Sequence, residues 1–260
     1  MSMSIDSMAS MLNTTNTDAT TNYNANALKK SLNGVSSETS EDELMQVCKD
    51  FESYFVEEVI KEVKKNFICG KPVYEGKLFG KNVALVISGI GKVSAALSCQ
   101  AAIDEYKPQA VINFGTAGGV DDTVTPREYY AVKNCCQFDF DLRDVDGVPL
   151  GYIQEYDRVF FDGNTYKTKV LFEERNLASA DRFTEGEADN NTVLSLGCSL
   201  RDMEGGAIAQ VCASCRVPLL IIKGVSDVTG SGSTAEQFRE NLTAVSKGFP
   251  SVIKKMLKGE

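Results

Sequence analysis

Apolar and polar positions change their spacing several times along the chain. From Leu44 to Val63 the apolar residues recur at helical spacing, and Ser40–Glu43, just before them, has the pattern of a capping box. This pattern predicts one long amphipathic helix over 41–67, whose apolar face needs a partner. Periodicity leaves two partners open, namely the next domain of the same chain or a different protein.

The first 40 residues lack such periodicity. Half of these positions are Ser, Thr or Asn, and large apolar residues are few. Such a segment buries too little apolar surface to offset the entropy that ordering would cost. We therefore expect 1–40 to be a disordered leader.

After the predicted helix the pattern becomes that of an α/β domain over 68–260. Its predicted elements are strands at 72–79, 83–88, 109–114 and 218–225, helices at 92–106, 186–196, 204–215 and 234–257, and a strand-rich middle at 127–182. Strands that alternate with helices in this way predict an α/β fold with a mixed, mainly parallel sheet flanked by helices.

Two glycine-rich segments follow predicted strands. Ser88–Lys92 reads SGIGK and lacks the frame of both common phosphate-binding loops, so a tight strand-to-helix turn explains it equally well. Gly115–Gly119 reads GTAGG and places no bulky side chain above the sheet edge. That absence of bulk favours the floor of a ligand pocket, and a flexible loop is the alternative.

Two carboxylates stand at positions where α/β proteins carry chemistry. Glu204 lies at the predicted start of a helix, where the helix dipole favours a negative charge, although many helices simply begin with a glutamate. Asp227 follows Ser226 at the end of a strand that is apolar on both faces. Ligands bind at such strand ends, and burial would let Asp227 hold a proton near neutral pH; a turn or helix-capping aspartate is the alternative.

Composition excludes several classes of function. The 260 residues contain 27 Lys plus Arg against 36 Asp plus Glu, and the net charge of −9 argues against binding nucleic acid or an anionic membrane. No apolar run approaches the ~20 residues of a membrane helix, and the N-terminus lacks a signal core, so we expect a cytoplasmic location without membrane insertion. The chain has no histidine, which leaves acid–base chemistry to carboxylates, Lys, Tyr, Cys or water.

The eight cysteines form only one Cys-x-x-Cys motif, at 212–215. A structural zinc site needs four ligands, so we expect no metal site. We expect buried free thiols in a reducing compartment instead of disulfides.

Four motifs carry a resemblance to a known family. They are VALVISGIGKVSAA (83–96), VINFGTAGG (111–119), RDMEGGAIAQV (201–211) and VPLLIIKGVSDV (217–228). In order and spacing they resemble the 5′-methylthioadenosine/S-adenosylhomocysteine nucleosidases of the nucleoside phosphorylase superfamily, over about 71–257. The resemblance implies a cofactor-free homodimer that hydrolyses the N-glycosidic bond of these adenine nucleosides and releases adenine, a step of methionine salvage.

The resemblance also implies roles for individual residues. Asp227, oriented by Ser226, would protonate or hydrogen-bond N7 of adenine, and Glu204 would bind the ribose hydroxyls and stabilise the cationic sugar. Met203 would pack under the ribose and Phe183 would stack on adenine. The sugar and nucleophile side would be shaped by four small or apolar residues, Ile90, Thr116, Ala117 and Gly118.

The nucleophile is open to two interpretations. Related bacterial purine nucleoside phosphorylases place an arginine for phosphate at the position of Asn113. Without that cation, the resemblance favours water over phosphate, and a purine nucleoside phosphorylase is the alternative.

The chain departs from this family at its N-terminus. The family begins with a buried strand that ends in Gly-Ala-Met/Leu-Glu-x-Glu, and one of these glutamates activates the attacking water. Nothing similar precedes Cys69, so the first strand is expected to be missing and hydrolysis to be impaired. Instead 42–67 resembles the N-terminal part of flagellar rod-binding proteins through Cys48, Phe51, Glu52 and Phe55. This implies a flagellar rod partner for 41–67, and a catalytically dead rod-associated protein is a further alternative.

Overall fold

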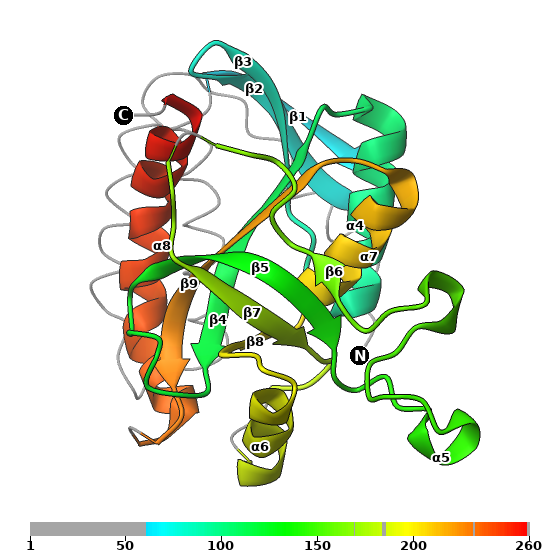
Figure 1. Ribbon diagram of the computed structural model, residues 1–260. Coiled ribbons are helices and arrows are strands. Elements are labelled where there is room, and N and C mark those ends of the chain that lie inside the picture. Colours follow the sequence, from blue (N-terminus) through cyan, green and yellow to red (C-terminus); the bar gives the residue numbers. More distant parts are fainter. Residues whose placement is uncertain (1–60, 169, 184–185, 231, 259–260) are drawn as a thin grey trace, which may run out of the picture.

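The structure, a computed structural model, describes residues 61–168, 170–183, 186–230 and 232–258 (Figure 1). The predicted leader and the part of the predicted helix before residue 61 lie outside the described residues. The same holds for the place where a family-type first strand would stand.

The C-terminal end of the predicted N-terminal helix is a strand, so that prediction is wrong for residues 61–67. Strand β1 (Lys61–Ile68) pairs antiparallel with β2 (Lys71–Leu78), and Phe67 lies opposite Pro72. Two residues with positive φ, Cys69 at 47° and Gly70 at 72°, join the two strands. This is the turn that two-residue hairpins prefer, and its geometry fixes the pairing where helical spacing suggested a helix.

Strand β3 (Lys81–Val86) completes a three-stranded antiparallel sheet in the order β1-β2-β3. The strands predicted at 72–79 and 83–88 are therefore confirmed, with shifts of up to two residues. Among the described residues this small sheet shares no hydrogen-bonded ladder with the larger sheet.

The larger sheet has six strands in the order β6-β5-β7-β8-β4-β9. Their bounds are β4 (Val111–Gly119), β5 (Tyr129–Gln137), β6 (Phe161–Asp162), β7 (Glu174–Ser179), β8 (Leu200–Asp202) and β9 (Leu219–Val228). An additional pairing of β5 with β9 closes five of these strands into a ring. The mixed sheet was predicted correctly, but its parallel pairings (β4–β9, β5–β7 and β7–β8) are matched in number by antiparallel ones (β4–β8, β5–β6 and β5–β9).

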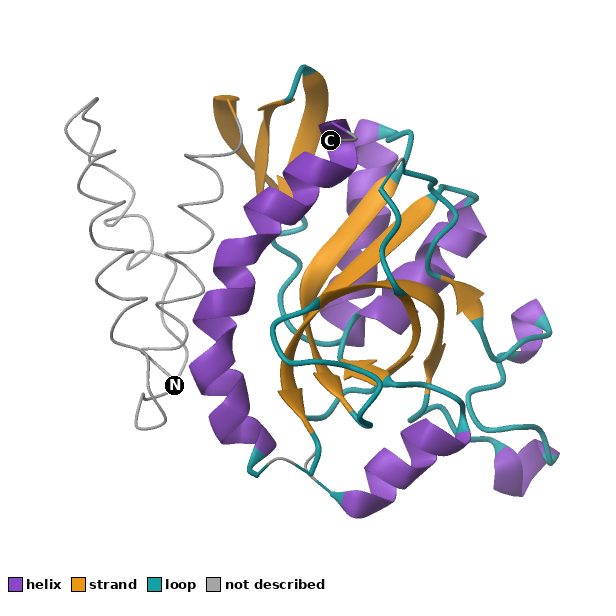
Figure 2. Ribbon diagram, turned by 60° about the vertical axis from the view of Figure 1, so that its left-hand side comes forward, coloured by secondary structure: helices purple, strands orange, loops and turns teal. Residues whose placement is uncertain are grey.

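Helices cover the closed sheet on two sides. Helix α7 (Gly205–Cys215) packs against one side of the closed sheet with α4 (Lys92–Tyr106) beside it, while α8 (Thr234–Lys258) runs along β9 and β4 on another side (Figures 1 and 2). Helix α6 (Glu187–Ser195) and two short helices, α5 (Arg143–Asp146) and η1 (Gln154–Tyr156), lie at the periphery. The four helices predicted at 92–106, 186–196, 204–215 and 234–257 are confirmed. None of the described helices is both long and apolar enough to cross a membrane.

The two strands that carry the motifs differ in burial. Every residue of β9 is buried, whereas β4 is only half-buried until its last three residues. The glycine motif at 115–119, predicted to follow a strand, is itself part of β4, because its backbone continues the parallel ladder and Gly118 lies opposite Asp227. The carboxyl ends of β4 and β9 therefore form one surface.

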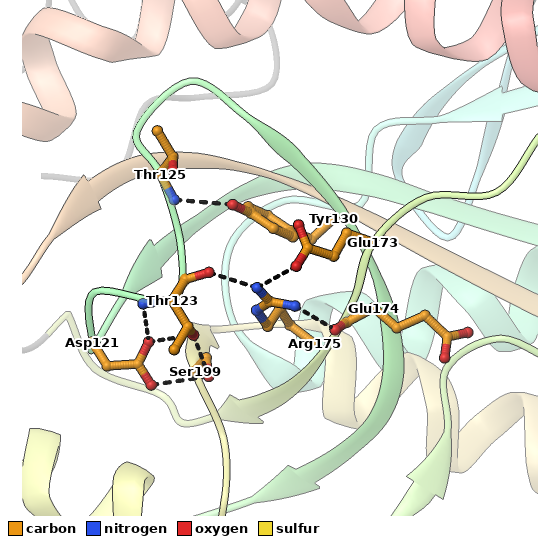
Figure 3. A network of polar contacts seen from close by, with 8 residues as sticks. All are labelled: Asp121, Thr123, Thr125, Tyr130, Glu173, Glu174, Arg175 and Ser199. Atoms are coloured by element: carbon orange, nitrogen blue, oxygen red, sulfur yellow. Dashed lines mark hydrogen bonds and ion pairs between the residues drawn. The ribbon is translucent and has the colours of Figure 1, made fainter.

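A network of polar contacts holds the loop that follows β4 (Figure 3). The Arg175 guanidinium donates to the Thr123 carbonyl oxygen and to Glu173 Oε1, both at 2.6 Å, and lies 5.1 Å from the centre of the Tyr130 ring. Asp121 accepts hydrogen bonds from the Thr123 backbone N–H (2.9 Å) and from the hydroxyl of Ser199 (3.0 Å). These contacts tie the loop to the starts of β7 and β8.

Candidate active site

A buried carboxylate lies at the carboxyl end of β9. Asp227 is only 1% exposed, and the Ser226 hydroxyl donates to its Oδ1 at 2.7 Å. Arg201 Nη2, from β8, lies 3.5 Å from Asp227 Oδ2, and the amide of Asn241 on α8 donates to the Ser226 carbonyl oxygen at 2.7 Å. The sequence predicted this serine–aspartate pair, but it did not indicate Arg201 or Asn241.

Gly118 makes room for this pair of charges. A Cβ at this position would lie 2.8 Å from Asp227 Oδ2 and 2.9 Å from Arg201 Nε, closer than real Cβ contacts occur. The space above this part of β4 is therefore filled by a carboxylate and a guanidinium. Gly118 therefore allows two charged side chains to approach the strand.

The second carboxylate meets the first glycine-rich turn. Glu204 precedes α7, and its Oε1 accepts a hydrogen bond from the Gly91 backbone N–H at 2.9 Å. Burial raises the pKa of the Glu204 carboxyl, and the neighbouring Asp202 adds to this effect, while Lys223 and the Gly91 N–H act in the opposite direction. Two motifs that are 113 residues apart thus form one structural unit.

A fully buried ion pair lies next to Glu204. Lys223 Nζ on β9 is 2.8 Å from Asp202 Oδ2 on β8, and the two side chains are 2% and 1% exposed. Asp202 also accepts hydrogen bonds from the Ser179 hydroxyl and from the Gly205 backbone N–H. Sequence reasoning missed this pair, although a lysine inside an apolar strand is a signal that a buried partner is required.

The remaining predicted site residues differ in their exposure. Phe183 is 52% exposed and makes an edge-on contact with Phe238 of α8, with ring centroids 5.8 Å apart. Ile90, at the tip of the glycine-rich turn, is 70% exposed. Met203 is half-buried. Phe238 was not predicted from the sequence.

The other two predicted residues lie on β4. Thr116 is half-buried and Ala117 is buried, opposite Gly224 and Val225 of β9.

The cysteines of the Cys-x-x-Cys motif have separate partners. Cys212 Sγ lies 3.7 Å from Cys99 Sγ, whereas the Cys215 thiol donates to Gln100 Oε1 at 3.2 Å. All cysteines in the described part of the chain are free thiols. In the same part, no three His, Cys, Asp or Glu side chains are grouped so that they would hold a metal ion.

Comparisons with known proteins agree with this architecture. The family model of the phosphorylase superfamily matches residues 35–258, so the match begins upstream of the first described residue. The 5′-methylthioadenosine/S-adenosylhomocysteine nucleosidase of Buchnera aphidicola subsp. Acyrthosiphon pisum (strain Tuc7) is 32% identical over 199 residues, which span 71% of this chain and 84% of that relative.

Solved structures show the same fold. The nucleosidase of the same name from Neisseria meningitidis, in complex with methylthio-immucillin-A, has a TM-score of 0.71 and 25% identity, and the match covers 81% of this chain and 96% of that chain. The futalosine hydrolase of Helicobacter pylori strain 26695 has the same TM-score at 22% identity, covering 81% of this chain and 92% of that one, and shares the fold. This chain belongs to the phosphorylase superfamily and, within it, to the family of 5′-methylthioadenosine/S-adenosylhomocysteine nucleosidases.

Proposed function

We propose that this protein binds adenine nucleosides with a 5′-thio substituent and hydrolyses their N-glycosidic bond. The main observation behind this proposal is a pair of carboxylates. Asp227 accepts a hydrogen bond from the Ser226 hydroxyl, and Glu204 accepts one from the Gly91 backbone N–H. The relatives' names supply the substrates, 5′-methylthioadenosine and S-adenosylhomocysteine. Adenine and the 5′-thio-substituted ribose are the expected products.

Asp227 is the proposed proton donor. Cleavage of the bond between C1′ of the sugar and N9 leaves the electron pair on adenine, and a proton or strong hydrogen bond at N7 neutralises that charge. The Ser226 hydroxyl donates to Oδ1 at 2.7 Å and orients the carboxyl toward the proposed position of the base. Arg201 Nη2 lies 3.5 Å from Oδ2 and contacts the same carboxyl from β8.

Glu204 is the proposed stabiliser of the sugar. As the base leaves, positive charge develops on the ribose ring, and a carboxylate placed in advance stabilises it without reorganisation. The carboxylate must be ionised for this role, which burial opposes and the charge of Lys223 favours. Lys223, which its ion pair with Asp202 holds in place, therefore supports the proposed chemistry.

The other residues complete the proposed pocket. Phe183 stacks on adenine, Met203 packs under the ribose, and Ile90 lines the side of the sugar. Thr116 and Ala117 lie on β4 beneath the position of the nucleophile. The exposure of Phe183 and Ile90 supports this proposal, because both side chains are available to a ligand.

Water is the proposed nucleophile, and we expect its activation to limit the rate of hydrolysis. Asn113, on β4, offers no cation for phosphate, which disfavours a phosphorylase. No Gly-Ala-Met/Leu-Glu-x-Glu sequence precedes Cys69, so the water lacks the family's base and hydrolysis is slow. Replacing residues 1–68 by a family-type first strand with its glutamate should accelerate adenine release by ~10²–10⁴-fold, the usual contribution of a positioned base.

Adenine release by the full chain tests the proposed function. We expect release from 5′-methylthioadenosine in phosphate-free buffer, no acceleration by phosphate, and no cleavage of inosine. Phosphate-dependent release would establish the phosphorylase alternative. Capture of flagellar rod subunits by the full chain, together with no binding of 5′-methylthioadenosine in calorimetry, would establish the rod-associated alternative.

The proposed assembly is a cytoplasmic homodimer. Val93 and Leu97 are exposed apolar residues in the first half of α4, with exposures of 79% and 47%, and a second copy would cover them. Free thiols at all described cysteines support a reducing location. Val93→Asp should convert a dimer into a monomer in sedimentation experiments, and an unchanged dimer would place the interface elsewhere.

A further inference from the structure

Three charged residues from three separate segments form a closed ring of hydrogen bonds at the rim of the site. The Lys92 backbone N–H donates to Asp181 Oδ1 at 2.6 Å, and the Asp181 backbone N–H donates to Asp139 Oδ2 at 2.9 Å. The Lys92 ammonium closes the ring on Asp139 Oδ1 at 2.5 Å, and both side chains of this ion pair are only 16% exposed. Shielding from water makes such an ion pair stronger than one at an open surface.

The ring joins the ends of elements that meet at one edge of the sheet. Lys92 is the first residue of α4, Asp139 follows the end of β5 by two residues, and Asp181 follows the end of β7 by two residues. Strands β5 and β7 are parallel neighbours, so their carboxyl ends lie at the same edge. The ring therefore bridges this edge to the glycine-rich turn before α4.

The ring also supplies the missing cap of α4. This helix has no side-chain cap of its own and no acidic residue in its first turn. Its two leading N–H groups, of Gly91 and Lys92, are instead accepted by Glu204 and Asp181, which are 113 and 89 residues away. Distant carboxylates thus satisfy the helix N-terminus and complement its dipole.

Each end of the ring adjoins a residue with a proposed role. Gly91, next to Lys92, holds Glu204, the proposed sugar stabiliser. Phe183, the proposed adenine stack, follows Asp181 by two residues. A side chain at position 91 would approach Asp181 Oδ1 to 3.2 Å in a backbone with φ of +90°, so the close approach requires glycine there.

We propose that Lys92, Asp139 and Asp181 are positioning residues that fix the adenine-stacking segment relative to the sugar-binding carboxylate. This inference rests on the proposed function, and it names the residues that hold the adenine side and the sugar side of the substrate site in fixed relative positions. The ring touches no reacting atom. Its loss therefore weakens the binding of substrate and leaves the chemical step largely unchanged.

Steady-state kinetics of the full chain with 5′-methylthioadenosine test this inference. Asp139→Asn keeps the size of the side chain and removes its charge, and KM should rise roughly 10-fold, as expected from losing one charge-assisted hydrogen bond. The value of kcat should stay within about threefold. Lys92→Met should have the same effect as Asp139→Asn, and Lys92→Arg should recover most of the affinity.

Asp141→Asn is the matched control. Asp141 lies two residues beyond Asp139 and pairs with Arg143 in water, so its replacement should leave KM unchanged. An unchanged KM in Asp139→Asn, or a fall in kcat with KM unchanged, would overturn the inference.

Amide hydrogen exchange tests the ring independently of turnover. Lys92→Met should speed exchange at 180–183 and at 91–92 in the ligand-free protein, and equal exchange in both proteins would overturn the inference. A wild-type chain that binds no adenine nucleoside would refute the proposed function, while the exchange result would still decide whether the ring holds these segments together.

Discussion

The two sheets of this molecule differ in one respect: the six-stranded sheet contains a buried ion pair, whereas the described lysines and glutamate of the three-stranded sheet are exposed or half-buried. In the six-stranded sheet one ion pair is inside: Lys223 and Asp202 are at most 2% exposed and pair at 2.8 Å. In the three-stranded sheet Lys65 is exposed, and its ammonium lies over the rings of Phe67 (5.8 Å) and Tyr74 (5.3 Å). Buried charges demand partners in fixed geometry, whereas surface charges tolerate rearrangement. The candidate site therefore lies where replacing one residue has the largest consequences.

The largest stability effect is expected for Lys223→Met. This change leaves Asp202 buried without its cation, which should lower the free energy of unfolding by about 3–5 kcal/mol. Urea denaturation of the two proteins measures the difference. The double variant Lys223→Met with Asp202→Asn removes the stranded charge and should recover most of the loss. A single variant within 1 kcal/mol of wild type would show that the interior of this sheet is no different from the surface.

The next largest effect is expected for Gly118→Ala. The new Cβ would meet Asp227 Oδ2 and Arg201 Nε at under 3 Å, and both residues are buried, so the free energy of unfolding should fall by about 1–3 kcal/mol. Gly115→Ala on the same strand is the control, because its Cβ would lie at an ordinary 3.6 Å from Lys223 Nζ. Equal stability of both variants in urea would refute the assigned packing at position 118.

A smaller effect is expected from pH. Burial raises the pKa of Glu204 in the folded protein above its value in the unfolded chain. The folded state therefore holds this proton more tightly, and ionisation of Glu204 costs stability as the pH rises through its raised pKa. The stability of wild type relative to Glu204→Gln should decrease from about pH 4 to pH 7 in urea titrations. An increase over this range would contradict the assigned shift.

The smallest effect is expected on the three-stranded sheet. Phe67 is 54% exposed on β1, and Phe67→Ser should change the free energy of unfolding by no more than about 0.5 kcal/mol. Urea denaturation measures it alongside the variants of the larger sheet. A loss above about 2 kcal/mol would show that this face is buried, and the contrast between the two sheets would then fail.

Local patterns predicted most of the fold. Helix α8 and strand β9 have clear spacing and clear boundaries in the sequence, and both were located correctly. The strand at 61–68 was missed, because the hairpin turn at Cys69–Gly70, and not the apolar spacing before it, decides its structure. Helical spacing in a short window is a weaker constraint than a turn with two positive φ angles.

The candidate site was only partly predictable. Asp227, Ser226 and Glu204 belong to sequence motifs, so they could be predicted from the sequence alone. Their partners Arg201 and Gly91 act through contacts across 26 and 113 residues, and the first of these depends on how β8 lies beside β4. Contacts of this kind depend on the order of the strands in the sheet, and a local sequence pattern does not predict that order.

Adenine release from 5′-methylthioadenosine by the full chain and by Asp227→Asn tests the central claim most directly. The account predicts slow release by the wild type and a further fall of ~10²–10⁴-fold in the variant, the usual contribution of a positioned proton donor. Calorimetry should show that the variant still binds the nucleoside, so that the loss belongs to the chemical step. Equal release by the two proteins would contradict the assignment of Asp227 as the group that makes adenine leave.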